Sequence, residues 1–334
     1  MKCSTPSLVA NHRATSVNGF EPSSSSTNLS VQENRSANWA KFLPIVIWTA
    51  LAVAVGVKAL LSPEHHSVWP IFANASLHWW EGKPLYVYYS GLDMYRYSPT
   101  FALLISPLAF FPLPISGCLW GMGSVALLYA ALRTLHRDVL EVRPGRSHRA
   151  IFLILSAVGV APMAWNLQTN ILILALISFG TASAARGQWW RAAFLLALPV
   201  FIKLWPVAWL AVVAAGRPRQ LLPRSMAALA ALAAIPFLMA APDTALQVYR
   251  DWGSALNTGQ AQRWPGYRDL ITVFLEWDVA IDPAIYRIIQ LAGAGLVLSA
   301  AFVSRHVSRS DRIGLSAGLA AWMCWQLLVG PGSE

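Results

Sequence analysis

The chain has 334 residues, of which 56% are hydrophobic and only 12% are charged, and its formal net charge is +10 at pH 7. Soluble domains carry about 25% charged residues, so a chain this poor in charge cannot cover a surface that faces water. The composition therefore predicts a polytopic membrane protein. Its positive charges lie in short segments between apolar runs, which argues against nucleic acid and indicates contact with the headgroups of membrane lipids.

The N-terminal segment 1–40 is rich in Ser, Thr and Asn, and we expect a disordered cytoplasmic tail. It has no apolar core before Phe42, so it does not read as a cleavable signal peptide. The apolar segment 41–61 reaches the ~20 residues that a membrane-spanning helix needs, and we expect an uncleaved anchor. Residues 41–334 are then predicted to form one multi-pass domain, an all-α integral membrane bundle.

Apolar segments recur along the rest of the chain, and several of them are short or interrupted by proline. They lie at about 100–111, 114–135, 150–164, 168–185, 191–215, 225–241, 285–304 and 312–329. Short or broken helices persist in a membrane only when they pack against protein or line a wet cavity. This pattern predicts an internal polar site within the bundle.

Lysine and arginine indicate the orientation, because short cytoplasmic loops are enriched in them. Three short basic stretches carry Arg133, Arg137, Arg143, Arg146 and Arg149; Arg217, Arg219 and Arg224; and Arg305, Arg309 and Arg312. With these on the cytoplasmic side of the cell membrane, the two long loops 62–98 and 242–284 fall on the opposite side. This topology requires that 100–111 is re-entrant and that 191–215 is a pair of half-helices.

The first long loop contains a predicted helix over 71–82, in which Ala73, Leu77 and Trp80 recur at helical spacing. Polar side chains occupy the other face: Asn74, His78 and Glu81. Such a helix is typical of a segment that lies in the membrane interface, where it is either a plain anchor or part of a site.

Two sets of residues in this loop are candidate proton acceptors. Asp93 lies next to Arg96 and Tyr97, at the start of an apolar segment. The carboxylate can act on a hydroxyl while the arginine holds a phosphate, or the two can form a salt bridge that only fixes the loop. Glu64 and His66 follow the first helix, and a neutral imidazole there can also accept a proton, although an interfacial histidine without chemistry is the alternative. No spacing typical of a metal site is present.

Two polar elements interrupt the apolar segments further along. Gln168 and Asn170 lie between two of these segments, where side-chain amides either bind sugar hydroxyls or cap the next helix. Lys203 lies inside an apolar segment, where a charged side chain is expensive; it therefore either lines a functional cavity or extends to the interface.

The second long loop combines arginine with aromatic residues and amides. Its candidates for substrate binding are Arg250, Asn257 and Arg263, with Trp252 nearby. Arginine suits a phosphate and an aromatic ring suits a sugar face or an isoprenoid chain. A solvated cap held by Arg–Asp pairs is the alternative.

Taken in order, five elements resemble glycosyltransferase family 87. They are Trp79–Tyr86 together with Arg96–Pro99 and the apolar run that follows, Asn166–Asn170, Ile202–Pro206, Trp252–Asn257 and Gly330–Glu334. Members of this family are multi-pass GT-C enzymes that use polyprenyl-phosphate sugars, often mannose. The resemblance implies transfer of a hexose, by expectation mannose, from a polyprenyl-phosphate donor to a glycan or glycolipid acceptor. We expect no cofactor besides the lipid-linked donor, and nothing in the sequence requires a divalent metal.

The resemblance also implies roles for particular residues. Substrate-binding residues are expected to be Arg96, Tyr97, Gln168, Asn170, Lys203, Arg250, Asn257, Arg263 and Glu334. Family members carry an aspartate just after the first helix as the base, whereas this chain has no aspartate between Leu61 and Tyr86. We therefore predict Asp93 as the catalytic base, with His66 and Glu64 as further candidates.

A second departure from the family pattern is that the chain stops at Glu334, where further helices are expected, so we expect a C-terminal truncation. Two other functions remain open at this point. One is a catalytically inactive membrane relative that lacks the base. The other is a transporter of a small molecule or lipid, which would also use broken helices and a lysine near the membrane midplane.

Overall fold

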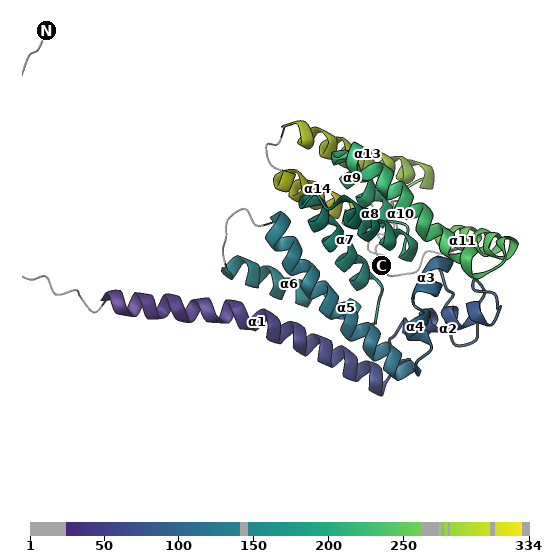
Figure 1. Ribbon diagram of the computed structural model, residues 1–334, viewed down its shortest axis with the longest axis horizontal. Helices are drawn as coiled ribbons and strands as arrows, with labels where there is room; N and C mark the ends of the chain where they lie inside the picture. Colours follow the sequence, from purple (N-terminus) through teal and green to yellow (C-terminus); the bar gives the residue numbers. More distant parts are fainter. Residues whose placement is uncertain are drawn as a thin grey trace, which may run out of the picture. The chain divides into compact units, whose positions relative to one another are not determined.

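The computed structural model describes residues 25–140, 146–261, 274, 277–279, 281–307 and 311–328 (Figure 1). Within these ranges the regular structure is helical and contains no strand, which confirms the predicted all-α class. Residues 40–334 form one unit, and the packing given below is that of this unit alone.

The helices follow one another from Ser25 to Leu328. They are α1 (Ser25–Leu61), α2 (Trp69–Trp80), α3 (Pro99–Leu104), α4 (Ser106–Ala109), α5 (Leu113–Leu135), the π-helix η1 (His136–Leu140), α6 (Arg146–Trp165), α7 (Asn170–Ala185), α8 (Trp189–Ile202), α9 (Pro206–Gly216), α10 (Pro218–Met239), α11 (Pro242–Ala261), α13 (Pro283–Val307) and α14 (Asp311–Leu328).

Four helical stretches among the described residues are long and apolar enough to cross a membrane. They are Trp39–Leu61, Leu113–Leu140, Ser147–Trp165 and Pro218–Met239. Each matches a predicted apolar segment. The helices α7, α8 and α9 are apolar but shorter, so they persist in a membrane through their packing against the longer ones.

The core is a row of helices in which α7 packs between α5 and α8, and α8 packs against α10 (Figure 1). Small residues let the backbones approach. A Cβ atom on Gly121 of α5 would come within 2.6 Å of Val55 of α1, and one on Gly180 of α7 would meet Leu196 of α8 at the same distance. In a lipid environment the hydrophobic effect does not drive helices together, so such close packing stabilises their association.

Several polar junctions between helices lie together at one end of the unit. The Val68 amide before α2 donates to the carbonyl of Asn166 before α7, at 3.1 Å. The Ser98 hydroxyl before α3 donates to the carbonyl of Phe201 near the end of α8. We call this the loop end. At the other end, Arg186 after α7 pairs with Asp138 of η1.

The segment 191–215 is broken as predicted. α8 ends at Ile202 and α9 begins at Pro206, and Lys203 between them has extended backbone angles. Arg224 near the start of α10 lies 5.6 Å from the Trp190 ring at the start of α8, so α8 begins at the end opposite the loop end. The break therefore lies at the tip of a helical pair.

The first half of the segment 242–284, where the sequence indicates a long loop, is the helix α11. Pro242 begins it and Asp243 lies in its first turn, where a carboxylate is favourable. Buried or half-buried residues recur along one face: Ala245, Val248, Tyr249, Trp252 and Ala255. Charged and polar residues between these positions make the segment look like a loop in the sequence, although the buried positions have the spacing of one helical face. The charged Arg250 lies on the exposed side.

The predicted helix over 71–82 is α2, displaced by two residues toward the N-terminus. Its buried face is centred on Trp69, Phe72 and Ser76 rather than on Leu77 and Trp80. The reason is that α2 packs against α3 and α4 rather than lying alone on a surface.

Candidate functional site

The site at the loop end begins with Ser98, which fixes the chain before α3. Its hydroxyl accepts a hydrogen bond from the Phe101 amide at 3.1 Å, so Ser98 is the N-cap of α3, and Pro99 occupies the first turn. The same hydroxyl donates to the carbonyl of Phe201 in α8. Residues 93–98 are therefore held beside the break at Lys203.

Tyr97 and Lys203 meet at this place. The Lys203 Nζ atom lies 5.8 Å from the centre of the Tyr97 ring, within the range of a cation–π interaction. The Tyr97 ring packs edge-on against Phe72 of α2 at 4.8 Å, and its carbonyl accepts a hydrogen bond from the Tyr86 hydroxyl at 2.9 Å. The ring is thus immobilised under the lysine, which lies at the tip of the broken helix pair.

Arg96 has an incompletely satisfied guanidinium. Its Nη2 atom lies 3.9 Å from the Asp93 carboxylate, beyond hydrogen-bond distance, and Nε and Nη2 are buried without a hydrogen-bond partner. The Arg96 side chain is 21% exposed, whereas that of Asp93 is 56% exposed. Buried donors without acceptors are costly, so this arrangement is typical of a place that receives an anion.

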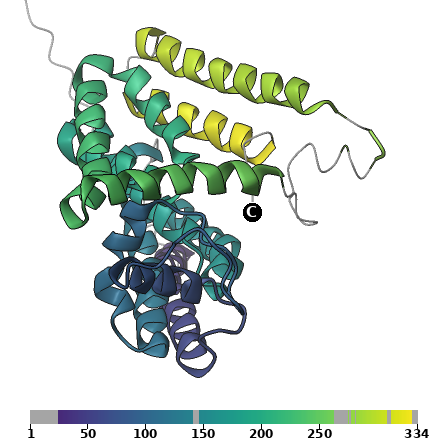
Figure 2. The ribbon, with the colours of Figure 1, turned by 90° about the vertical axis from the view of Figure 1, so that its right-hand side faces the viewer.

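α11 packs against residues 96–100 and holds them through two of its aromatic side chains. The Trp252 indole N–H donates to the carbonyl of Arg96 at 3.2 Å, and the Tyr249 hydroxyl lies 3.0 Å from the Thr100 hydroxyl. Figure 2 shows α11 running across this part of the unit, beside α3 and after α10. Contacts from α3, α8 and α11 therefore converge on residues 93–100.

Burial also sets the charge state of the surrounding tyrosines. It raises the pKa of Tyr86 and of Tyr95 well above the usual value of 10.0. Both phenols stay neutral and donate to backbone carbonyls, Tyr86 to Tyr97 and Tyr95 to Ser98. Charged groups near these tyrosines include Asp93, Arg96, Lys203 and Asp251 of α11, and the charge of Asp251 also raises the pKa of Tyr86.

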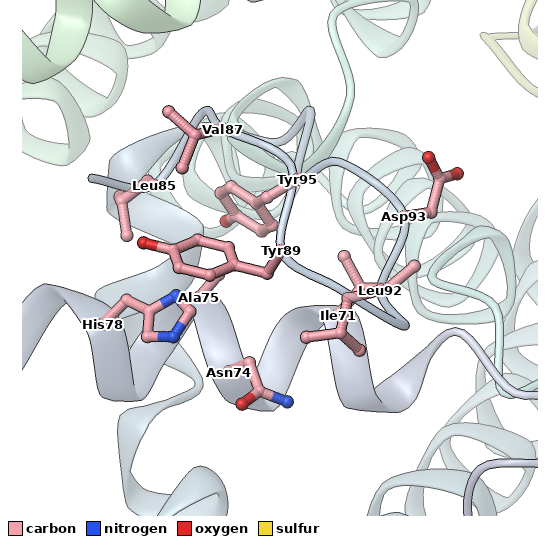
Figure 3. Close-up of a pocket in the computed structure, with 10 residues that line it drawn as sticks. All are labelled: Ile71, Asn74, Ala75, His78, Leu85, Val87, Tyr89, Leu92, Asp93 and Tyr95. Atoms are coloured by element: carbon pink, nitrogen blue, oxygen red, sulfur yellow. The ribbon is translucent and has the colours of Figure 1, made fainter. Parts of the chain in front are cut away.

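Asp93 also lies at the rim of a shallow hollow between α2 and the following loop (Figure 3). The hollow is open to solvent and has room for about one water molecule. Figure 3 shows His78 and Tyr89 at one end and Asp93 at the other, with Asn74 on the α2 side. The sequence indicates Asn74 and His78 only as the polar face of a helix, and it gives no signal for Tyr89.

Gln168 and Asn170 form a separate pair. The Asn170 amide donates to the Gln168 side-chain oxygen at 3.3 Å, and Asn170 Oδ1 is buried without a hydrogen-bond partner. Neither the residue before α7, Thr169, nor Asn170 makes a side-chain cap, so the interpretation of this element as a helix cap is not supported. Trp120 donates to the Leu167 carbonyl at 3.0 Å and its ring contacts Phe72, which joins this pair to Tyr97 through buried rings.

Glu64 and His66 lie in an exposed turn after α1. His66 has a positive φ of 46°, and its carbonyl accepts a hydrogen bond from Lys58 at 2.9 Å. Lys58 holds this turn, and no hydrogen bond within the described residues joins it to Asp93.

The structure describes only some of the remaining predicted residues. Arg250 is exposed on α11, and Asn257 belongs to the same helix, although its side chain lies outside the described part. Arg263 and Glu334 also lie outside the described residues. Among the residues that the structure describes, no group of three His, Cys, Asp or Glu could hold a metal ion.

Comparison with known proteins agrees with the resemblance noted in the sequence. The model of glycosyltransferase family 87 matches residues 95–331, which is more than half of the chain and begins within the site at Tyr95. No curated protein and no solved structure matches the chain. The chain therefore belongs to glycosyltransferase family 87, a GT-C family of polyprenyl-phosphate mannosyltransferases, and it is a membrane glycosyltransferase with a sugar donor and an acceptor.

Proposed function

We propose that this enzyme transfers mannose from a polyprenyl-phosphate donor to a hydroxyl of a glycan or glycolipid on the non-cytoplasmic face of the cell membrane. The observation that carries the proposal is that Lys203 lies over the ring of Tyr97, next in the chain to Arg96, whose guanidinium lies 3.9 Å from the Asp93 carboxylate. Two cations and one exposed carboxylate are the groups that this reaction requires.

The donor phosphate binds between Arg96 and Lys203. A lipid-linked donor keeps its isoprenoid chain in the bilayer, so its phosphate has to meet cations where helices end. Lys203 lies in the break between α8 and α9, and Arg96 offers buried donors that lack a protein acceptor. Arginine holds phosphate oxygens with directed hydrogen bonds, and lysine adds a point charge.

Asp93 acts as the general base. Its carboxylate takes the proton of the acceptor hydroxyl while the hydroxyl oxygen forms a bond to C1 of the sugar. The bond between C1 and the phosphate oxygen breaks, and its electron pair leaves with the polyprenyl phosphate. Arg96 and Lys203 stabilise the charge that develops on this leaving group, which is an electrostatic contribution to catalysis.

Other predicted residues keep supporting roles in this proposal. Gln168 and Asn170 bind hydroxyls of the donor sugar, and Asn170 has an unsatisfied buried oxygen that suits a hydroxyl donor. Arg250 and Arg263 add positive charge for the donor phosphate, and Asn257 and Glu334, which belong to elements that resemble the family, contact donor or acceptor. Glu64 and His66 are the reserve candidates for the base.

The distribution of charge supports the proposed side of the membrane. Arg137 and Arg186 meet at Asp138, and Arg224 lies over Trp190 of α8, all away from the loop end. Because arginine-rich junctions face the cytoplasm, the loop end faces the other side.

The test is sugar transfer in membranes that contain this chain, with radiolabelled polyprenyl-phosphate mannose or a nucleotide-linked mannose as the donor. We expect product from the polyprenyl donor only. Arg96→Gln and Lys203→Met should each lower the rate about 10²-fold or more, as removal of one electrostatic stabiliser does. Arg219→Gln, at an exposed position in a basic junction, is the matched control. Transfer from the nucleotide donor, or no transfer by an inserted and folded protein, would overturn the proposal.

A further inference from the structure

A second cationic junction lies at the end opposite the loop end, where α8 and α10 begin next to each other. The guanidinium carbon of Arg224 in α10 lies 5.6 Å from the centre of the Trp190 ring in α8, within the range of a cation–π interaction. The Trp190 ring is itself exposed. Tryptophan and arginine at the start of membrane helices are typical of the interface, where the ring contacts apolar chains and the charge meets lipid headgroups.

The protein satisfies only part of the hydrogen-bonding capacity at this junction. The Arg224 Nη1 atom donates to the backbone carbonyl of Gln220, one turn earlier in the same helix. The Arg224 Nε atom and the side-chain oxygen of Gln220 are both buried and have no hydrogen-bond partner. Because such atoms are costly, they suit a ligand that brings an anionic oxygen to Arg224 and a hydrogen-bond donor to Gln220.

The surroundings of the junction carry an excess of positive charge. Arg191 lies in the first turn of α8 and Arg219 in the first turn of α10, and both are exposed. The sequence contains no aspartate or glutamate between Glu141 and Asp243, so the chain segment that forms these helices has no carboxylate of its own. The junction therefore attracts anions, and a phosphate is the anion that a membrane interface supplies.

An exposed apolar strip continues from the junction along the two helices. α8 and α10 pack against each other and run in the same direction, since both begin at this end and both reach α3 near the other. Phe194, one turn after Trp190, is exposed. Ala227 and Ala231 follow Arg224 on its face of α10 and are also exposed. Because α10 is long and apolar enough to cross a membrane, this strip can contact an acyl chain.

We propose that this junction binds one anionic phospholipid from the leaflet at this end of the protein. The lipid phosphate accepts hydrogen bonds from Arg224, and a headgroup hydroxyl donates to the side-chain oxygen of Gln220. One acyl chain lies beside Phe194 and the two alanines. The site is separate from Arg96 and Lys203, which lie at the loop end, so the inference stands whether or not the proposed transfer reaction is correct.

The first test counts bound lipid by native mass spectrometry. The full chain is delipidated in detergent and mixed with equal amounts of phosphatidylglycerol and phosphatidylcholine that carry the same acyl chains. We expect the first bound lipid to be phosphatidylglycerol by about tenfold, as hydrogen bonds to a charged group predict. Arg224→Gln should abolish this preference. Arg219→Gln removes the same charge from an exposed position of the same helix and should keep it.

The second test examines the hydroxyl that Gln220 is proposed to bind. Phosphatidylmethanol has the same phosphodiester charge as phosphatidylglycerol but no headgroup hydroxyl. The unchanged chain should favour phosphatidylglycerol by roughly threefold or more, the worth of one neutral hydrogen bond. Gln220→Leu should bind these two lipids equally and still favour both over phosphatidylcholine. This variant keeps every arginine, so it tests the site even if Arg224→Gln does not fold.

Three results would overturn the proposal. An equal loss of preference in Arg224→Gln and Arg219→Gln would mean that the arginines attract anionic lipid without forming a site. Equal binding of phosphatidylglycerol and phosphatidylcholine by the unchanged chain would mean that no anion is selected. Full displacement of phosphatidylglycerol by soluble glycerol 3-phosphate would mean that the junction takes a free phosphate ester rather than a lipid. None of these measurements depends on sugar transfer.

Discussion

Each end of this protein carries an aspartate beside arginine, and the two arrangements differ in how the charges are satisfied. At the loop end, Asp93 and Arg96 are 3.9 Å apart, and the carboxylate is more than half exposed. At the opposite end, the Asp138 carboxylate is only 12% exposed and contacts Arg137 at 2.9 Å and Arg186 through its other oxygen. We call Asp93 and Arg96 the open pair, because their charges are not in contact, and Asp138 with its two arginines the closed cluster.

The difference shows how the same residue types serve two purposes. The closed cluster ties the π-helix η1 to the end of α7, and both oxygens of Asp138 are occupied. The open pair joins residues of one short loop, leaves one arginine face without acceptors and leaves the carboxylate accessible. The closed cluster therefore contributes to stability, whereas the open pair leaves its charges available to a substrate.

Asp93→Asn gives the largest expected effect. It removes the proton acceptor but keeps the size of the side chain, so the rate of sugar transfer should fall about 10²–10⁴-fold. Exposed salt bridges contribute only about 0–1 kcal/mol, so the melting temperature should hardly change. Initial rates with radiolabelled donor and a thermal melt of the same preparation measure both. Retained turnover would shift the base to Glu64 or His66.

Asp138→Asn reverses this pattern. It leaves Arg137 and Arg186 without their shared partner in a partly buried place, and we expect a loss of roughly 1–3 kcal/mol in the free energy of unfolding, since both arginines still reach solvent. A lowered melting temperature in nanodiscs would show it. The transfer rate per folded molecule should equal that of the unchanged chain. A selective loss of turnover at an unchanged melting temperature would contradict the contrast between the two ends.

Much of this architecture can be predicted from the sequence, because membrane spans and helix breaks leave local signals. The apolar run ending at Leu61 and the break at Lys203 are examples. The site is harder to predict, since Ser98 meets Phe201 and Trp252 meets Arg96 only after folding. α11 is hard to predict because its charged residues make the segment look like a loop, although Ala245, Tyr249 and Trp252 have the spacing of a buried helical face. Tyr89 carries no local signal, because its role comes from its contact with His78.

Tyr249→Phe should have a smaller effect, and we expect it to be confined to the loop end. The phenol donates to the carbonyl of Ala233 at 2.9 Å and contacts the Thr100 hydroxyl, which keeps another acceptor in the carbonyl of Leu232. Losing these bonds should reduce stability by about 1 kcal/mol. Because α11 then holds residues 93–100 less firmly, hydrogen exchange at the Arg96 and Tyr97 amides should quicken. Unchanged exchange there would mean that Trp252 alone docks α11.

The smallest expected effect is a dependence of stability on pH at His78. The folded-state pKa of His78 is lowered, chiefly by burial, so in mild acid the unfolded chain takes up a proton before the folded chain does. The contribution of His78 to stability is therefore fully present above pH 6.5 and is lost as the pH falls through the lower, folded-state pKa. The melting temperature of the unchanged chain should fall more between pH 7 and 5 than that of His78→Gln, which has no proton to gain. His148→Gln, at an exposed position, should follow the unchanged chain. Parallel curves for all three proteins would show that the surroundings of His78 do not disfavour the charged imidazole.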